Sequence, residues 1–236
     1  MVHTRDYMTC NLVRMLIVNS AIILAGGSGS RIESEIPKQF LTLSNKPIIE
    51  YSIDMFEKNT NIDEIILVCK KEYIESTLIQ KLSNSYKIVK GGDTRTQSTI
   101  KGLIACNEST RNVLIHDSAR PFISNKIINS CIKHLTENDA SIPIISCKDS
   151  LLELKKNGIQ YLNRDNIKLI QTPQGFNYEK ILTALKNNTK NYSDDFSALL
   201  DFDNQAKYAL FNGDHNNFKI TTNTDLVLAK ILSDEI

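Results

Sequence analysis

A glycine-rich segment near the N-terminus is the first candidate for chemistry. The run Ala25-Gly26-Gly27-Ser28-Gly29 directly follows a short apolar stretch. Ligands of open α/β sheets bind beyond the carboxyl ends of the strands, and glycine amides can approach phosphate oxygens closely because no Cβ intervenes. The spacing matches neither the Walker pattern G-x-x-x-x-G-K-S/T nor the dinucleotide fingerprint G-x-G-x-x-G. We therefore expect a phosphate-binding turn of another kind.

Two cations follow this turn in the sequence. Arg31 comes two residues after the last glycine, and Lys38 stands between Pro37 and Gln39. A triphosphate held by the glycines would use both positive charges. The glycines alone would fit a tight turn with a solvated basic flank equally well, but their combination with Arg31 and Lys38 favours a nucleotide.

The segments that must position these residues alternate between strand-like apolar runs and runs with helical spacing. Short apolar runs rich in β-branched residues predict buried strands of a mostly parallel sheet, and runs with helical spacing lie between them. This alternation is typical of a doubly wound, layered α/β fold. The expected strands are Ala21–Ala25, Ile65–Cys69, Val113–Ile115 and Ser141–Ile145; the expected helices contain Ile49 to Phe56, Ile100 to Ile104 and, behind Ser124 as N-cap, Ile128 to Leu135.

The segment at about 148–170 interrupts the alternation. Asn157-Gly158 lies between alternating apolar residues on both sides, which is the strongest short-range signal for a β-hairpin. An isolated hairpin is only marginally stable, so we expect this inserted arm to pack on a second subunit, as in a homodimer. We expect further helices around 196–200 and 228–232, a disordered extension at 1–15, and one domain at 16–236.

Composition excludes several classes of protein. With Lys+Arg 28 against Asp+Glu 27, the net charge of +1 offers no general field for binding a nucleic acid. The five cysteines include no C-x-x-C pair, which argues against a disulfide framework or a zinc site and favours a reducing cytoplasm. Leu12 to Leu24 is broken by polar residues and falls short of the ~18 apolar residues of a membrane span. Translation could begin at either Met1 or Met15.

Five further motifs appear in order along the chain, and together with the glycine loop and Pro37-Lys38-Gln39-Phe40 they make a specific set. The set resembles the 2-C-methyl-D-erythritol 4-phosphate cytidylyltransferase family of isoprenoid synthesis, from about Ser20 to Leu232. The motifs are Gly91-Gly92-Asp93-Thr94-Arg95-Thr96-Gln97-Ser98, Ile115-His116-Asp117-Ser118-Ala119-Arg120-Pro121, Gln171-Thr172-Pro173-Gln174, Ser193-Asp194-Asp195 and Asn217-Phe218-Lys219-Ile220-Thr221.

The resemblance implies a Rossmann-like, three-layer nucleotidyltransferase fold and a role for each matched residue. Lys38, Lys219 and Arg31 would be catalytic, on the phosphates of CTP. The substrates would be CTP and a polyol phosphate, with Mg²⁺ as cofactor. Ala25, Gly26, Gly27, Ser28, Gly29, Gly92, Asp93, Ser98, Asp117 and Ser118 would bind the nucleotide, with Asp117 also on the metal; Arg120, Ser150, Thr172 and the partner subunit's Arg164 would bind the polyol phosphate.

The implied chemistry needs charge stabilisation more than proton transfer. A phosphate monoester would attack the α-phosphorus of CTP and displace pyrophosphate. Because its second pKa is near ~6, this phosphate is already mostly dianionic at neutral pH and needs no general base. We expect His116 to be a hydrogen-bonded structural histidine, and helix capping accounts for Asp194 and Asp195 without a functional role.

Three alternatives remain open from the sequence. A related cytidylyltransferase for ribitol 5-phosphate shares most of the nucleotide-side motifs. A catalytically inactive nucleotide-binding module would keep the fold, although the presence of both Lys38 and Lys219 argues against it. A nicotinamide oxidoreductase is disfavoured by the missing dinucleotide fingerprint.

Overall fold

A computed structural model describes residues 17–27, 36–82, 85–187, 190 and 192–235. The expected N-terminal extension at 1–15 lies outside the described residues, and so do three expected site residues, Ser28, Gly29 and Arg31. Everything said below of the structure refers to the described part of the chain.

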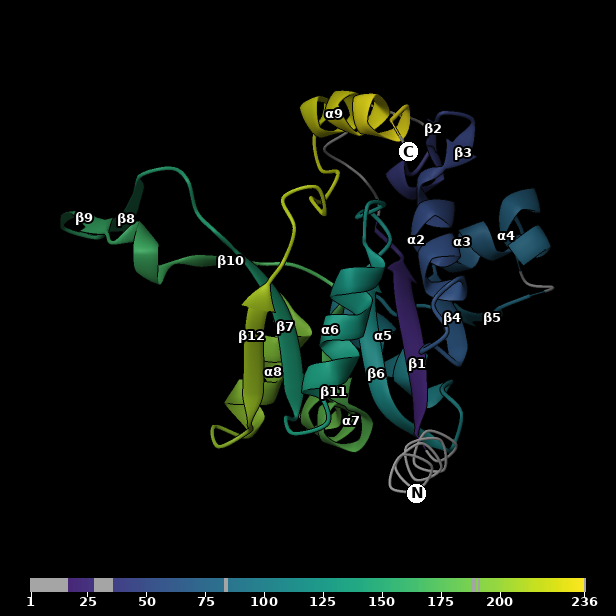
Figure 1. The fold of residues 1–236 in the computed structure, drawn as a ribbon, viewed down its shortest axis with the longest axis horizontal. Coiled ribbons are helices and arrows are strands. Elements are labelled where there is room, and N and C mark those ends of the chain that lie inside the picture. The colour runs from purple at the N-terminus through teal and green to yellow at the C-terminus, as the bar shows by residue number, and fades with distance from the viewer. Residues whose placement is uncertain (1–16, 28–35, 83–84, 188–189, 191, 236) are drawn as a thin grey trace, which may run out of the picture.

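An eight-stranded, mostly parallel sheet forms the centre of the molecule (Figure 1). Its order is β10-β7-β11-β6-β1-β4-β5, and β12 also pairs with β7. The pairs of β1 with β4 and β6, of β4 with β5 and of β7 with β12 are parallel, whereas β10 and β11 run antiparallel to their neighbours. The strands are β1 (Val18–Ala25), β4 (Glu64–Cys69), β5 (Lys87–Lys90), β6 (Thr110–Asp117), β7 (Ala140–Ser146), β10 (Lys168–Ile170), β11 (Gln174–Asn177) and β12 (Tyr208–Asn212).

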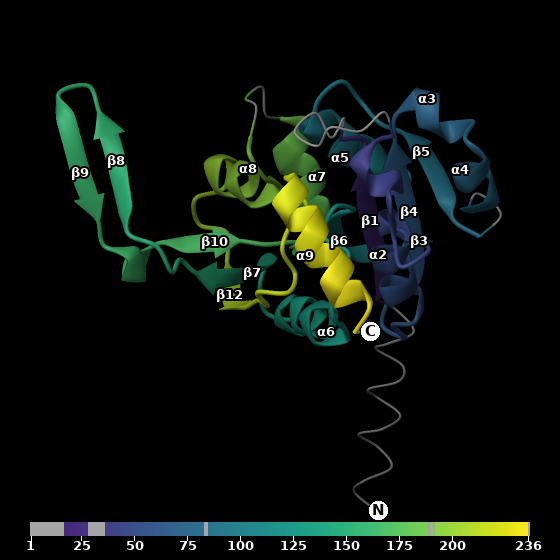
Figure 2. The ribbon, with the colours of Figure 1, turned by 90° about the horizontal axis from the view of Figure 1, so that it is seen from above.

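Helices cover both faces of this sheet and complete three layers (Figure 2). Successive side chains of a strand point to opposite faces; accordingly, Ile22 of β1 packs in one buried cluster and Ile23 in another. This confirms the expected layered α/β fold. Helices α5 (Arg95–Ile104), α7 (Tyr178–Lys186) and α8 (Asp195–Phe202) contribute to the first cluster, and α2 (Ile48–Glu57), α4 (Thr77–Leu82) and α6 (Asn125–His134) to the second.

Smaller elements complete the described part. Helix α9 (Asn223–Ser233) packs beside α2 and the short β2–β3 pair through a third buried cluster around Leu43, Ile48 and Ile220. None of the described helices is long and apolar enough to cross a membrane. The remaining elements are η1 (Lys38–Phe40), β2 (Thr42–Leu43), β3 (Lys46–Pro47), α3 (Lys71–Ile74) and η2 (Arg164–Asn166).

The expected hairpin arm is present as β8 (Leu151–Lys155) and β9 (Gly158–Leu162), which pair only with each other among the described strands and project away from the main sheet (Figures 1 and 2). Lys155 pairs with Gly158, so the two loop residues are Lys156 and Asn157, one position earlier than the Asn-Gly pair suggests. Gly158 has φ 139°, a backbone conformation that residues with a Cβ rarely adopt.

Candidate active site

A cavity of about 340 Å³ opens at the carboxyl ends of β1, β4 and β6. These strands are parallel neighbours, so the residues that follow them meet at one edge of the sheet. The cavity is lined by Leu24, Gly26, Gly27, Lys38, Gln39, Lys70, Gly92, Asp93, Thr94, Arg95, Ser98, Asp117, Ser118, Ala119, Lys219 and Thr221.

The wall formed by Gly92 and Asp93 is shaped by the start of α5. Thr94 caps this helix in a reciprocal capping box with Gln97, and the amide of Gly92 donates to Ser98 Oγ at 3.0 Å. A Cβ on Gly92 would overlap the Gln97 side chain, so this position requires glycine. The expected nucleotide residues Gly92, Asp93 and Ser98 thereby reach the cavity together.

Both predicted catalytic lysines line the cavity, although they come from distant parts of the sequence. Gln39 Nε2 donates to the carbonyl of Ala25 at 2.8 Å, which ties η1 and its first residue, Lys38, to the end of β1. Lys38 Nζ donates to the carbonyl of Ile220 at 2.9 Å, and Lys219 Nζ donates to Asp117 Oδ2 at 2.7 Å. The site therefore concentrates positive charge that the near-neutral composition does not reveal.

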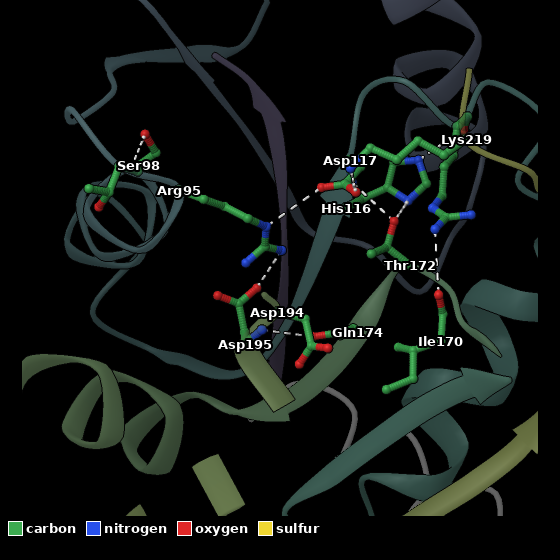
Figure 3. Close-up of polar contacts among 12 residues, drawn as sticks. Arg95, Ser98, His116, Asp117, Ile170, Thr172, Gln174, Asp194, Asp195 and Lys219 are labelled. Carbon is green, nitrogen blue, oxygen red and sulfur yellow. Dashed lines mark hydrogen bonds and ion pairs between the residues drawn. The ribbon is translucent and has the colours of Figure 1, made fainter. Parts of the chain in front are cut away.

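Asp117 ends β6 as a largely buried carboxylate between two cations, Lys219 and Arg95 (Figure 3). Burial by itself would raise the pKa of Asp117, but the neighbouring positive charges, led by Lys219 and Arg95, hold this pKa well below its usual range. Asp117 is consequently an anion at any physiological pH.

Arg95 lines the cavity as well, although it was not predicted as a site residue from the sequence. Its Nη2 lies 2.8 Å from Asp195 Oδ2, and its Nε lies 3.9 Å from Asp117 Oδ1. Burial lowers the pKa of Arg95, but the carboxylates of Asp195 and Asp117 raise it more, so the net shift is upward. A signal was available: Arg95 is the first residue of a helix, where the helix dipole disfavours a cation, and such an arginine needs an anion nearby.

The two acids at the start of α8 have different roles. Asp194 caps the helix by accepting from the Ser197 amide at 2.8 Å, as expected. Asp195 is only 1% exposed and pairs with Arg95, so capping does not account for it. Gln174 Oε1 accepts from the amides of Asp195 and Phe196 at 3.2 and 3.1 Å. Helix α8 is thereby joined to β11.

His116 is fully buried behind Asp117, and its hydrogen bonds match the structural role expected from the sequence. Nε2 lies 3.0 Å from the carbonyl of Arg120, which can only accept, so Nε2 carries the proton. Nδ1 then accepts from the Thr172 hydroxyl at 3.2 Å, and that hydroxyl accepts from the Asp117 amide at 3.1 Å. Burial lowers the pKa of His116 to about 4, so the ring is neutral near pH 7.

The residues expected to bind the polyol phosphate do not line this cavity. Thr172 is buried beneath it, and Arg120 Nη1 donates to the carbonyl of Asn217 at 2.8 Å. Ser150 and Arg164 belong to the arm, where Arg164 Nη1 donates to the carbonyl of Lys148 at 2.9 Å. Within one chain, the structure therefore brings together Gly26, Gly27 and most other expected nucleotide-side residues but not the acceptor-side residues. Ala25 contributes its carbonyl to Gln39.

The described residues hold no group of three or more His, Cys, Asp or Glu side chains that could enclose a metal. Asp93 and Asp117 are the carboxylates among the described cavity residues.

Comparisons with known proteins converge on one family. The model of the family "2-C-methyl-D-erythritol 4-phosphate cytidylyltransferase" matches residues 19–234. A curated relative of that name from Clostridium botulinum (strain Loch Maree / Type A3) is 39% identical over 227 residues, covering 92% of this chain and 98% of the relative. Another of that name, from Lachnospira eligens, is 38% identical over 91% of this chain and 98% of its own length. The solved structure of 4-diphosphocytidyl-2C-methyl-D-erythritol synthase from Anaerococcus prevotii superposes with a TM-score of 0.80 at 31% identity, covering 92% and 99% of the two chains.

Proposed function

This chain belongs to the 2-C-methyl-D-erythritol 4-phosphate cytidylyltransferase family, and we propose that its cavity is the place where a cytidylyl group passes from CTP to 2-C-methyl-D-erythritol 4-phosphate. Pyrophosphate is the second product, and the reaction belongs to isoprenoid precursor synthesis. The observation that carries this assignment is that Lys38 and Lys219 line one cavity with Gly26 and Gly27.

The triphosphate is held where those four residues meet. The amides of Gly26 and Gly27 face its oxygens, and the ammonium groups of Lys38 and Lys219 contact the α-phosphate. The attacking phosphate is a dianion at neutral pH, so the barrier lies in bringing two anions together and in stabilising the charge that develops on the phosphoryl oxygens. The two lysines supply this stabilisation. Arg31, outside the described residues, is assigned to the leaving pyrophosphate on the resemblance alone.

The base and ribose occupy the wall next to α5. We assign Gly92, Asp93 and Ser98, which share this wall, to the cytosine. Ser98 also holds the loop by accepting from the Gly92 amide. Ser118, directly after Asp117, contacts the ribose. A base wall made of a helix N-terminus is rigid, which supports selection of one nucleotide.

A magnesium ion fits the donors present. Mg²⁺ in nucleotide sites takes one or two carboxylates and completes its shell with phosphate oxygens and water, and Asp117 is an ionised carboxylate at the cavity wall. We assign Asp117 to this ion, together with oxygens of CTP. When bound, it neutralises part of the triphosphate charge. Treatment with EDTA should abolish pyrophosphate release, and added Mg²⁺ should restore it; full turnover in EDTA would remove the metal from this assignment.

The acceptor phosphate is bound by Arg120, Thr172 and Ser150, with Arg164 reaching from a second copy of the chain. The arm supports a homodimer, since Leu154 and Tyr161 on it are 80% and 72% exposed and apolar surface of this kind favours association.

We therefore expect light scattering to show a dimer. Leu154→Asp should shift it towards monomer and raise KM for the acceptor, because Arg164 then no longer reaches the other site. Ile104→Asp, at another exposed apolar residue, on α5 and 60% exposed, serves as the control. An active preparation that is monomeric at working concentration would contradict the dimer.

The assay that tests the function measures pyrophosphate release from CTP with each of two acceptors. We expect turnover with 2-C-methyl-D-erythritol 4-phosphate to exceed turnover with ribitol 5-phosphate. A preference for ribitol 5-phosphate would reassign the substrate, and CTP binding without pyrophosphate release on either acceptor would make the chain a nucleotide-binding module.

The compartment is assigned to the cytoplasm. The described cysteines Cys69, Cys106, Cys131 and Cys147 are free thiols, which suits a reducing environment. Cell fractionation with an antibody to the chain tests this, and recovery in an oxidising compartment would contradict it.

A further inference from the structure

Four side chains of alternating charge run from the cavity into the protein interior, in the order Lys219, Asp117, Arg95 and Asp195 (Figure 3). They come from the loop before α9, the end of β6 and the first residues of α5 and α8. The separations are 2.7 Å for Lys219 to Asp117, 3.9 Å for Asp117 to Arg95 and 2.8 Å for Arg95 to Asp195.

The inner end of this row is firmly held. Asp195 is almost completely buried, and its backbone amide is bound by Gln174 of β11. An acid at the first turn of a helix also interacts favourably with the helix dipole. The 2.8 Å ion pair therefore attaches the Arg95 guanidinium to a part of the fold that has little freedom to move.

The outer end must change when nucleotide binds. In the structure the Lys219 ammonium is bound to Asp117, whereas the proposed reaction requires that ammonium on the α-phosphate. Once Lys219 turns to the phosphate, Asp117 loses its nearest protein partner. A magnesium ion bound with CTP would restore positive charge to Asp117, but among the described side chains Arg95 is the other cation paired with this carboxylate, at Oδ1. Arg95 is therefore the protein group left to fix the direction of the carboxylate.

We propose that Arg95, held in place by its ion pair with Asp195, is a positioning residue. It keeps Asp117 oriented towards the nucleotide after Lys219 has moved to the α-phosphate. This inference rests on the proposed function of the cavity. An arginine suits the task because its planar guanidinium addresses one carboxylate through Nη2 and another through Nε in a fixed geometry, which the point charge of a lysine reproduces only in part. Arg95 acts through Asp117 and makes no step of the reaction itself.

The test is a double-mutant cycle between Arg95 and Asp117. Arg95→Gln should lower kcat by roughly 10- to 100-fold, the usual cost of losing a group that orients a ligand-binding side chain, with little change in KM for CTP. In an Asp117→Asn background, Arg95→Gln should change kcat by less than about twofold, because its effect requires the carboxylate. Arg95→Lys should recover part of the loss, and Asp195→Asn should lower kcat in the same direction as Arg95→Gln.

Arg111→Gln is the matched control, because this exposed arginine lies on the same strand as Asp117 but outside the cavity. Thermal unfolding of each variant shows whether it is folded. Additive losses in the double variant, a large rise in KM for CTP in Arg95→Gln, or no benefit from Arg95→Lys would each overturn the inference. If the wild-type chain releases no pyrophosphate from CTP, the proposed function itself has failed and not the role of Arg95.

Discussion

Replacing Lys38 with alanine should lower kcat by roughly 10²–10³-fold, the usual scale for one preorganised donor to the transition state. Lys38 lines the cavity beside the glycine turn, and its ammonium is positioned by the carbonyl of Ile220. That carbonyl is neutral, so losing the contact leaves no unpaired charge on Ile220. The loss should therefore fall mainly on kcat, with a smaller rise in KM for CTP. Steady-state pyrophosphate release measures both constants.

Lys126→Ala is the control for this variant, because Lys126 is an exposed lysine on α6 away from the cavity. Its kinetics should equal those of the wild type. Turnover of Lys38→Ala at the wild-type rate, in a preparation whose melting temperature is unchanged, would show that Lys38 does not contact the reacting phosphate.

Lys219→Ala should also lower kcat by roughly 10²–10³-fold, for the same reason, but it should differ from Lys38→Ala in its effect on nucleotide binding. Its ammonium neutralises Asp117 at 2.7 Å, so in the alanine variant this carboxylate repels an incoming polyanion when no magnesium ion offsets its charge. Repulsion between like charges in a partly buried site is screened little by salt, so the Kd for CTP measured in EDTA should rise clearly. Isothermal titration calorimetry with CTP in EDTA measures this increase, and the pyrophosphate assay measures kcat.

A second variant separates the two effects of Lys219. In Lys219→Ala/Asp117→Asn the negative charge is gone, so the Kd for CTP in EDTA should return towards the wild-type value. The kcat with magnesium should stay low, because Asp117 is also the proposed magnesium ligand. If Kd in EDTA does not fall in the double variant, then repulsion by Asp117 is not the cause. If Lys219→Ala turns over at the wild-type rate, the assignment of Lys219 to the α-phosphate is wrong.

Local patterns were sufficient to predict the elements that are continuous and apolar. The four predicted strands lie within β1, β4, β6 and β7, and Ser124 caps α6 by accepting from the Ile127 amide. In each of these elements the buried side chains come from one short apolar run, so that run alone indicates the element. The hairpin arm was predicted for a similar reason, since its turn is encoded by neighbouring residues.

Elements whose stability comes from their neighbours were missed. Strand β11 (Gln174–Asn177) is inserted antiparallel between β6 and β7, and its four residues QGFN show no strand periodicity. Strand β12 was not predicted either. Both strands are held by a sheet that is already formed, so tertiary packing outweighs their weak local preferences. Helix α7 was also missed, although its signal is local: Ile181, Ala184 and Leu185 have helical spacing behind the N-cap Asn177.

The sequence by itself determined the fold class and, through the family resemblance, the choice of Lys38 and Lys219 as candidates, because both depend on residue types in a given order along the chain. Only the tertiary structure decided that Lys38 and Lys219 share one cavity and that Arg95 links Asp117 to Asp195. The physical reason is that an ion pair depends on the distance between charges in space, and the spacing of residues along the chain does not specify that distance.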